Sequence, residues 1–181
     1  QYPTGVLKEH LQVRSAAGLF DVSHMGQIKV SSRRGDQAEL LHCLEKLMPC
    51  DLSRLSEGRQ CYSFFTKESG GLSDDLMIAN RGDHFLLVVN ASRKFDDLSH
   101  LHDKIGDKSN VELLDDRALI ALQGPLSSLI LEELNDRISE MFFLDVRTIK
   151  LLGIECWVSR SGYTGEDGFE LSIPNFHVIT V

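Results

Sequence analysis

The sequence lacks both the long apolar runs of a membrane protein and the basic excess of a nucleic-acid-binding protein. Its 181 residues carry 27 acidic side chains against 19 basic ones, for a net charge of −8. The longest apolar stretches, such as 85–89 and 118–122, fall far short of the roughly 20 residues that span a bilayer. An acidic chain also offers no basic stripe for a phosphate backbone. We therefore expect neither a membrane nor a nucleic-acid partner.

Spacings typical of metal, disulfide and nucleotide sites are also scarce. The four cysteines form no C-x-x-C pair, which favours reduced, buried and inert thiols over reactive or paired ones. His100 and His102 lie two apart on a predicted helix and so point to different sides, which argues against a helical chelate. Neither a phosphate-binding loop nor a dinucleotide fingerprint is present. We expect no metal site.

Three stretches have the apolar spacing of amphipathic helices. Asp36 can cap the first, which ends at Pro49, and Gly106 stops the second. The third opens at Gly124-Pro125, where proline is tolerated in the first turn. The apolar side chains of each helix should form one stripe along its surface, and each stripe should pack on a sheet. In order, the stripes are Leu40, Leu41, Leu44, Leu47 and Met48; Phe95, Leu98, Leu101 and Ile105; and Leu126, Leu129, Ile130 and Leu134.

Short apolar or alternating runs bounded by turn residues predict strands. Several follow one another without an intervening helix, and 81–83 and 153–154 resemble hairpin turns. We therefore predict an α+β fold with mixed, partly antiparallel sheets and amphipathic helices packed on them, with a boundary between two subdomains near 106–117. The predicted strands are 27–31, 62–66, 76–79, 84–89, 118–123, 148–152, 155–159 and 169–173.

Two adjacent acids stand between a glycine turn and an apolar strand. Asp74 and Asp75 follow Gly70-Gly71 and precede Leu76. Neighbouring side chains of an extended backbone point to opposite faces, so the two carboxylates should have different roles. One interpretation is a partly buried carboxylate with altered proton affinity. The alternative is an Asx turn with two solvated acids.

The segment 161–170 is dense in glycine around Tyr163, Glu166 and Asp167, and it leads to Glu170. Glycines at this density permit positive φ and let a ligand approach the backbone closely. The alternative is a plain tight loop before an edge strand. Glu170 alternates with apolar neighbours, so it points either to water or into a polar cavity.

Five motifs in this order resemble a known family, the tetrahydrofolate-dependent aminomethyltransferases that form the T-protein of the glycine cleavage system. The resemblance runs from about residue 7 to 174 and covers about the first half of a family member. We expect residues 1–181 to form the folate-binding region and the family's C-terminal β-barrel domain to be absent. The motifs are 19–26 (LFDVSHMG), 70–76 (GGLSDDL), 88–91 (VVNA), 122–125 (LQGP) and 161–170 (SGYTGEDGFE).

The resemblance implies a reaction and two partners. Family members take an aminomethyl group from the lipoyl arm of the H-protein, pass its one-carbon unit to tetrahydrofolate and release ammonia. The expected partners are therefore the lipoylated H-protein and folate. Tetrahydrofolate serves as the one-carbon acceptor, and no metal takes part. We expect the bacterial cytoplasm as the location, with the mitochondrial matrix as the alternative.

The resemblance also assigns roles to single residues. Asp75 matches the catalytic aspartate of the family, and Glu170 matches the glutamate that binds the pterin. A carboxylate suits a pterin because it accepts two parallel hydrogen bonds from adjacent N–H groups. Further positions match residues that line the folate cavity: Tyr163, Tyr62, Met25 and Asn90.

Two other functions fit the same resemblance. One is a non-catalytic folate-binding protein of the same fold. The other is the folate-binding part of an enzyme like sarcosine or dimethylglycine dehydrogenase. The presence of both Asp75 and Glu170 favours the transferase.

Overall fold

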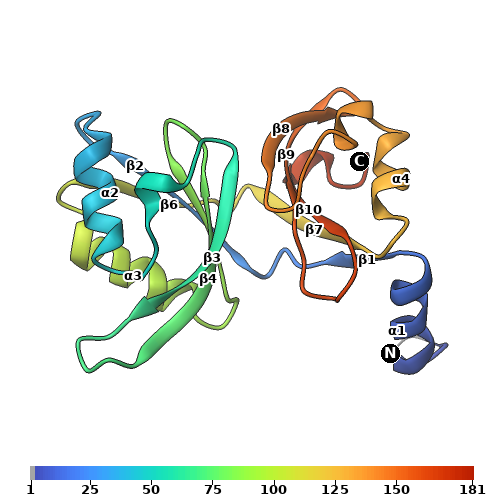
Figure 1. Cartoon of the computed structure of the whole chain (residues 1–181), viewed down its shortest axis with the longest axis horizontal. Coiled ribbons are helices and arrows are strands. Elements are labelled where there is room, and N and C mark those ends of the chain that lie inside the picture. The colour runs from blue at the N-terminus through green and yellow to red at the C-terminus, as the bar shows by residue number, and fades with distance from the viewer. Residues whose placement is uncertain (1–2) are drawn as a thin grey trace. The chain divides into compact units, whose positions relative to one another are not determined.

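The computed structural model describes residues 3–181, which form two compact units. Unit 1 combines the chain up to Ser23 with the segment Asp116–Val181, and unit 2 is the continuous segment His24–Asp115. The chain thus leaves unit 1 once and returns to it once, as the change of colour along the ribbon shows (Figure 1). Each unit has its own sheet and its own core.

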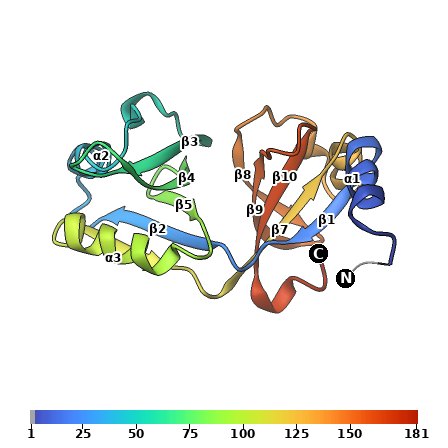
Figure 2. The same cartoon turned by 90° about the horizontal axis from the view of Figure 1, so that it is seen from below.

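Unit 2 contains a five-stranded sheet whose neighbouring strands are all antiparallel (Figure 2). The predicted hairpin at 81–83 joins two of these strands, with Gly82 at φ 86° in the turn. A positive φ at this point suits glycine, which has no Cβ to clash. In spatial order the strands are β3 (Arg59–Thr66), β4 (Leu72–Asn80), β5 (Phe85–Val89), β2 (Gly26–Ser32) and β6 (Ser109–Leu113).

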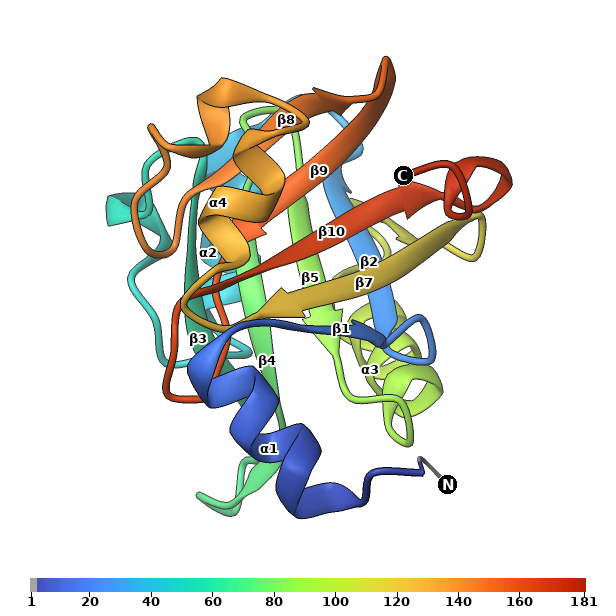
Figure 3. The same ribbon diagram turned by 90° about the vertical axis from the view of Figure 1, so that its right-hand side faces the viewer.

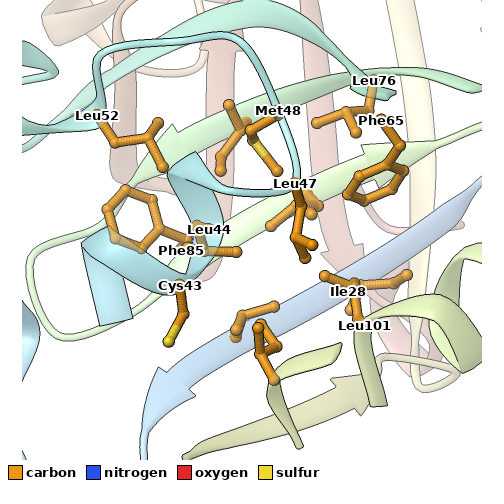
Figure 4. Packing of buried hydrophobic residues seen from close by; sticks show 14 of the residues in the cluster. Ile28, Cys43, Leu44, Leu47, Met48, Leu52, Phe65, Leu76, Phe85 and Leu101 are labelled. Carbon is orange, nitrogen blue, oxygen red and sulfur yellow. The ribbon is translucent and has the colours of Figure 1, made fainter. Parts of the chain in front are cut away.

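Two helices, α2 (Gln37–Glu45) and α3 (Lys94–Ile105), cover one face of this sheet. As predicted, Asp36 caps α2, and its carboxylate accepts a 2.9 Å hydrogen bond from the Glu39 N–H. Figure 4 shows the packing: Leu44 lies beside Phe85, and Met48 belongs to the same cluster as Phe65 and Leu76 of the strands. A short 3₁₀ helix, η1 (Leu52–Arg54), adds Leu52 to the same core.

Unit 1 contains a second five-stranded antiparallel sheet (Figure 3). The predicted hairpin at 153–154 connects β8 and β9 through Leu152 and Gly153, whose φ values of 48° and 84° fit a two-residue turn with positive φ. In spatial order the strands are β1 (Gly18–Asp21), β7 (Arg117–Gln123), β10 (Gly168–Pro174), β9 (Ile154–Arg160) and β8 (Val146–Leu151).

Helical segments cover one face and one edge of the unit 1 sheet. The helix α4 (Ser127–Glu132) packs against β10, and α1 (Val6–Ser15) lies beside β1 (Figure 3). Two 3₁₀ helices complete the unit, η2 (Asp136–Ile138) and η3 (Asn175–His177). The core contains apolar side chains from β7, β8, β9 and β10 and from the segment 131–141: Leu122, Leu131, Ile138, Met141, Ile149, Leu151, Cys156, Val158, Phe169, Leu171 and Ile173.

The predicted α+β fold and all eight predicted strands are confirmed. Sequence patterns missed α1, β1 and β6, of which α1 buries no side chain. Two predicted stripes are partly wrong. Phe95 is 67% exposed, because α3 turns Asp97, Leu101 and Ile105 to the sheet.

The stripe predicted for α4 is also wrong in most positions. Leu126, Leu129 and Ile130 are exposed, while Ser127 and Leu131 are buried. This helix has only six residues. Two positions one turn apart are therefore enough to cover its buried side.

All four cysteines are free thiols, as expected; Cys43 and Cys156 are buried, and Cys50 and Cys61 are partly buried. Within residues 3–181, every helix falls short of the length and apolarity that a bilayer crossing requires.

Candidate functional site

The two adjacent acids of β4 point to opposite faces of the unit 2 sheet. Asp74 is in phase with Leu76 and Ile78, which are buried under the helices, whereas Asp75 is in phase with Met77 on the other face. Asp75 is exposed, and Asp74 is partly buried with its Oδ2 atom fully enclosed. The different roles expected for the pair therefore have a structural basis, and the alternative of two solvated acids is wrong.

Two side chains from neighbouring strands hold the Asp75 carboxylate. The Tyr62 hydroxyl on β3 donates to Oδ2 at 2.8 Å, and the Asn90 amide, just beyond β5, donates to Oδ1 at 2.7 Å. The same Asn90 nitrogen also lies 3.0 Å from Oδ1 of Asp74. Both donors are neutral, so they fix the orientation of the carboxylate without cancelling its charge.

The negative charge beside Tyr62 affects the pKa of its hydroxyl group. Its pKa is raised above the ordinary value of 10, first by the hydrogen bond to Asp75, then by burial and by the charges of Asp75 and Asp74. The phenol therefore remains a donor throughout the neutral range. An oriented carboxylate in an exposed position can stabilise positive charge that develops on a bound substrate.

Met25 lies at the same end of this sheet. It directly precedes Gly26, which pairs with Val89, the residue before Asn90. A Cβ at Gly26 would come within 2.7 Å of side-chain atoms of Val89 and Lys94, so this approach requires glycine. Gly26 thereby fixes where the strand begins and where Met25 stands.

Glu170 belongs to unit 1 and lies on β10. Its neighbours Phe169 and Leu171 point into the core, and Glu170 points to the opposite face, where it is partly buried. The Ser161 hydroxyl lies 3.3 Å from Oε2, and Ser159 and Ser161 are 3.1 Å apart. Burial raises the pKa of the Glu170 carboxyl above its ordinary value, and the two hydroxyls oppose that rise.

Gln123 anchors the glycine-rich loop that leads to Glu170. This buried side chain donates 2.9 Å to the Ser161 carbonyl and 3.2 Å to the Phe169 carbonyl, at the two ends of the loop. A Cβ at Gly162 or Gly168 would collide with the Gln123 amide. The loop therefore closes tightly around one amide, but β10 is a central strand and not the edge strand of the alternative interpretation.

Two arginines tie the same loop to the rest of unit 1. Arg160 makes a two-bond pair with Asp167, at 3.0 and 2.5 Å, and donates to the Met141 carbonyl. Arg14 of α1 bonds the Thr164 carbonyl at 2.9 Å and pairs with Glu166 at 3.0 Å. These contacts give α1 a fixed place although it buries no side chain.

Tyr163 stands at the tip of the loop with 97% of its surface exposed. It helps to line a hollow of about 590 Å³ formed mainly by α1 and β1, with Val13, Leu19 and Phe20 among the apolar side chains. Glu170 does not line this hollow.

The structure brings together three of the six residues predicted from the sequence. Tyr62, Asp75 and Asn90 are joined by hydrogen bonds. Met25 lies at the same sheet end, and Glu170 and Tyr163 belong to the other unit. The sequence interpretation assigned no role to two buried polar residues.

These two missed residues are Gln123 and Asp97. Gln123 stands inside the LQGP motif, where a polar residue at the end of an apolar strand was an available signal. Asp97 is 2% exposed, yet nothing in the sequence separates it from its exposed neighbour Asp96. No group of three His, Cys, Asp or Glu side chains able to hold a metal occurs within residues 3–181.

Sequence comparison with known proteins identifies one family. A family profile described as the GCVT N-terminal domain matches residues 1–181. A mitochondrial aminomethyltransferase of Dictyostelium discoideum is 43% identical over 185 residues, covering 97% of this chain and 45% of that protein. An aminomethyltransferase of Thermoanaerobacter sp. (strain X514) is 42% identical over 179 residues, covering 96% and 47%.

A solved structure agrees with these relatives. The glycine cleavage system aminomethyltransferase T from Bartonella henselae superposes with a TM-score of 0.89 at 35% identity, over 99% of this chain and 48% of that one. The chain thus spans about half the length of these three aminomethyltransferases.

Proposed function

Because the chain belongs to the GCVT N-terminal domain family, we propose that it carries the folate-binding region of a glycine cleavage aminomethyltransferase. The reaction moves the one-carbon unit from the aminomethyl-lipoyl arm of the H-protein to tetrahydrofolate and releases ammonia. The partners are the lipoylated H-protein and folate, and no metal takes part. The proposed location is the bacterial cytoplasm, with the mitochondrial matrix as the alternative; aminomethyltransferase relatives with and without a mitochondrial name are compatible with both.

The observation that carries this proposal is the hydrogen-bonded arrangement of Tyr62, Asp75 and Asn90. As ammonia leaves, positive charge builds on the transferred carbon. A carboxylate already oriented by two neutral donors stabilises that charge without reorganising at the moment of reaction. Asp75 is therefore assigned an electrostatic and orienting role first, and proton handling second.

Glu170 is assigned to the pterin. A carboxylate accepts two parallel hydrogen bonds from the amide and amino N–H groups of that ring. The partly buried position beside Ser159 and Ser161 supports this role, because hydrogen bonds at a shielded carboxylate lose less to water. Met25, Tyr62, Asn90 and Tyr163 are proposed as further folate contacts.

The test replaces Asp75 in the longest polypeptide that the gene encodes. Asp75→Asn keeps the shape and removes the charge, so the rate of tetrahydrofolate-dependent ammonia release from aminomethylated H-protein should fall about 100-fold. Glu112→Gln, an exposed acid on β6 of the same sheet, is the matched control. Wild-type rates in Asp75→Asn would remove the assigned role.

The same assay separates the two other functions. A non-catalytic folate-binding protein would bind tetrahydrofolate and release no ammonia from the H-protein. A part of an enzyme like sarcosine or dimethylglycine dehydrogenase would also release none, and would instead support oxidation of those N-methyl amines. Either result contradicts the proposed transferase.

A further inference from the structure

One acidic residue of α3 lies on the buried side of the helix, where an apolar residue is expected. Asp97 lies in the first turn of α3 and is 2% exposed, in line with the buried Leu101 and Ile105 at four-residue intervals. Phe95, two residues earlier, is 67% exposed. A buried ionised carboxylate is costly unless it is paired, so Asp97 needs a partner.

That partner is a second carboxyl group, Asp74 of β4. Asp74 points to the helix-covered face of the sheet, and an interaction between its carboxyl group and that of Asp97 contributes, after burial, to the raised pKa of Asp97. Each of them has a buried Oδ2 atom to which no N–H or O–H group of the described residues donates. Two carboxylate ions in this arrangement would repel each other, whereas one proton held between them satisfies both.

The surrounding charges agree with one shared proton. Burial, then the hydrogen bond to Asp74 and its charge, raise the pKa of Asp97 to about 7. Arg93, at the start of α3, opposes the rise, and Asp96 adds to it. Asp97 therefore holds its proton below neutral pH and loses it as the pH rises through about 7.

The pair connects directly to the proposed catalytic aspartate. Oδ1 of Asp74 accepts a 3.0 Å hydrogen bond from the Asn90 amide nitrogen, and the same nitrogen donates to Oδ1 of Asp75 at 2.7 Å. The amide thus bridges one acid that faces the helices and one that faces outward. The same nitrogen also donates to the Asp75 carbonyl at 3.3 Å, so if Asp74 turned away, Asn90 would lose one of the three acceptors that set its orientation.

We propose that Asp97 is a positioning residue for Asp75: its protonated carboxyl donates to Asp74, which keeps the Asn90 amide in the orientation that holds the Asp75 carboxylate. The expected effect of Asp97 on the turnover rate rests on the proposed function. The proton stays within the pair and never reaches substrate. When Asp97 ionises, the proton goes to solvent, and the repelling carboxylates release Asn90.

The direction of the pH effect follows. Below neutral pH the pair is protonated and Asp75 is held, and as pH rises through the range near 7 the arrangement loosens. The turnover rate should therefore fall as the pH rises through this range. We call this falling part of the pH profile the alkaline limb. Asp97→Asn supplies a permanent amide donor to Asp74, so it should remove the limb, whereas Asp97→Ala should lower the rate about tenfold or more at every pH.

The experiment has two readouts on the longest polypeptide that the gene encodes. The first is the pH profile of turnover, from about pH 5.5 to about pH 9, for wild type, Asp97→Asn, Asp97→Ala and Asp103→Asn. Asp103 is an exposed acid on the same helix, so its variant should keep the wild-type limb. An unchanged limb in Asp97→Asn would overturn the proposal.

The second readout needs no activity. The side-chain amide NMR signal of Asn90, assigned by its loss in Asn90→Ala, should titrate with a midpoint near 7 in wild type and stay constant in Asp97→Asn. If the Asn90 amide signal of the wild type does not titrate, the proposal is wrong even when the enzyme is active. A titrating signal with no ammonia release from H-protein contradicts the proposed function and leaves the coupling of Asp97 to Asn90 in place.

Discussion

The Tyr62 hydroxyl donates a 2.8 Å hydrogen bond to Oδ2 of Asp75 across the β3–β4 pair. Tyr62 pairs in register with Met77, two residues beyond Asp75 on the same face. The bond is therefore a diagonal contact between neighbouring strands, of the kind that long aromatic side chains reach. It fixes one oxygen of the carboxylate that we assign to the reaction.

Tyr62→Phe should lower the turnover rate about tenfold, because it removes one of two hydrogen bonds that orient Asp75. Stability should not change, since Tyr62 is 63% exposed. Steady-state kinetics and thermal unfolding measure the two effects. Ser53→Ala removes a comparable exposed bond, from a hydroxyl to Asp51, and should leave the rate unchanged. Equal rates in wild type and Tyr62→Phe would show that the bond has no role in turnover.

The ionisation of Tyr62 gives a second prediction. Since the bond to Asp75 is the largest cause of its raised pKa, Asp75→Asn should move that pKa down toward 10. Absorbance of the phenolate during an alkaline titration measures the shift, with Tyr62→Phe identifying which signal belongs to Tyr62. If the Tyr62 titration curve is the same in Asp75→Asn as in wild type, the hydrogen bond between Tyr62 and Asp75 is contradicted.

Glu170→Gln should weaken tetrahydrofolate binding about 10- to 100-fold, because a charge-assisted pair of hydrogen bonds is lost. Its effect on stability has the opposite sign. The folded state raises the Glu170 pKa above 4.5, so the stabilising protonated form is lost as pH rises through the folded pKa. The glutamine variant should therefore gain stability relative to wild type as pH rises above 4.5.

Urea denaturation at several pH values and calorimetric folate titration test both parts of the Glu170 prediction. Glu155→Gln, an exposed acid on β9 of the same sheet, should change neither quantity. Unaltered folate affinity in Glu170→Gln would remove Glu170 from the folate site.

Gly168→Ala should destabilise the protein by about 2 kcal/mol, because the new Cβ displaces the buried Gln123 amide from two carbonyl groups. Gly162→Ala meets the same amide and should cost a similar amount. The double variant should cost little more than either one, since both displace one side chain. Gly71→Ala, which meets only Ser69 at 3.9 Å, is the control. If the losses in free energy of unfolding measured by urea denaturation simply add in the double variant, the two glycines do not act through the same Gln123 amide.

Local signals in the sequence predicted much of the fold. Asp36 marked the start of the first predicted helix, and the structure has that cap. The predicted end at Pro49 is wrong, because α2 ends at Glu45. Gly153 marked the β8–β9 hairpin, where a positive φ is required. By contrast, α1 could not be predicted from burial, because its place depends on Arg14 bonds to a loop about 150 residues away.

The sequence by itself determined eight strands of the described chain, though not β1 and β6. It also determined that Asp74 and Asp75 face opposite sides, because side-chain alternation is a local property of extended backbone. Only the tertiary structure decided their partners. Tyr62 and Asn90 lie 13 and 15 residues from Asp75, and they meet it through strand register, which no spacing in the sequence encodes. The burial of Asp97 also depended on the tertiary structure, because a helix acid is tolerated in a buried position only where a neighbouring element supplies a polar partner.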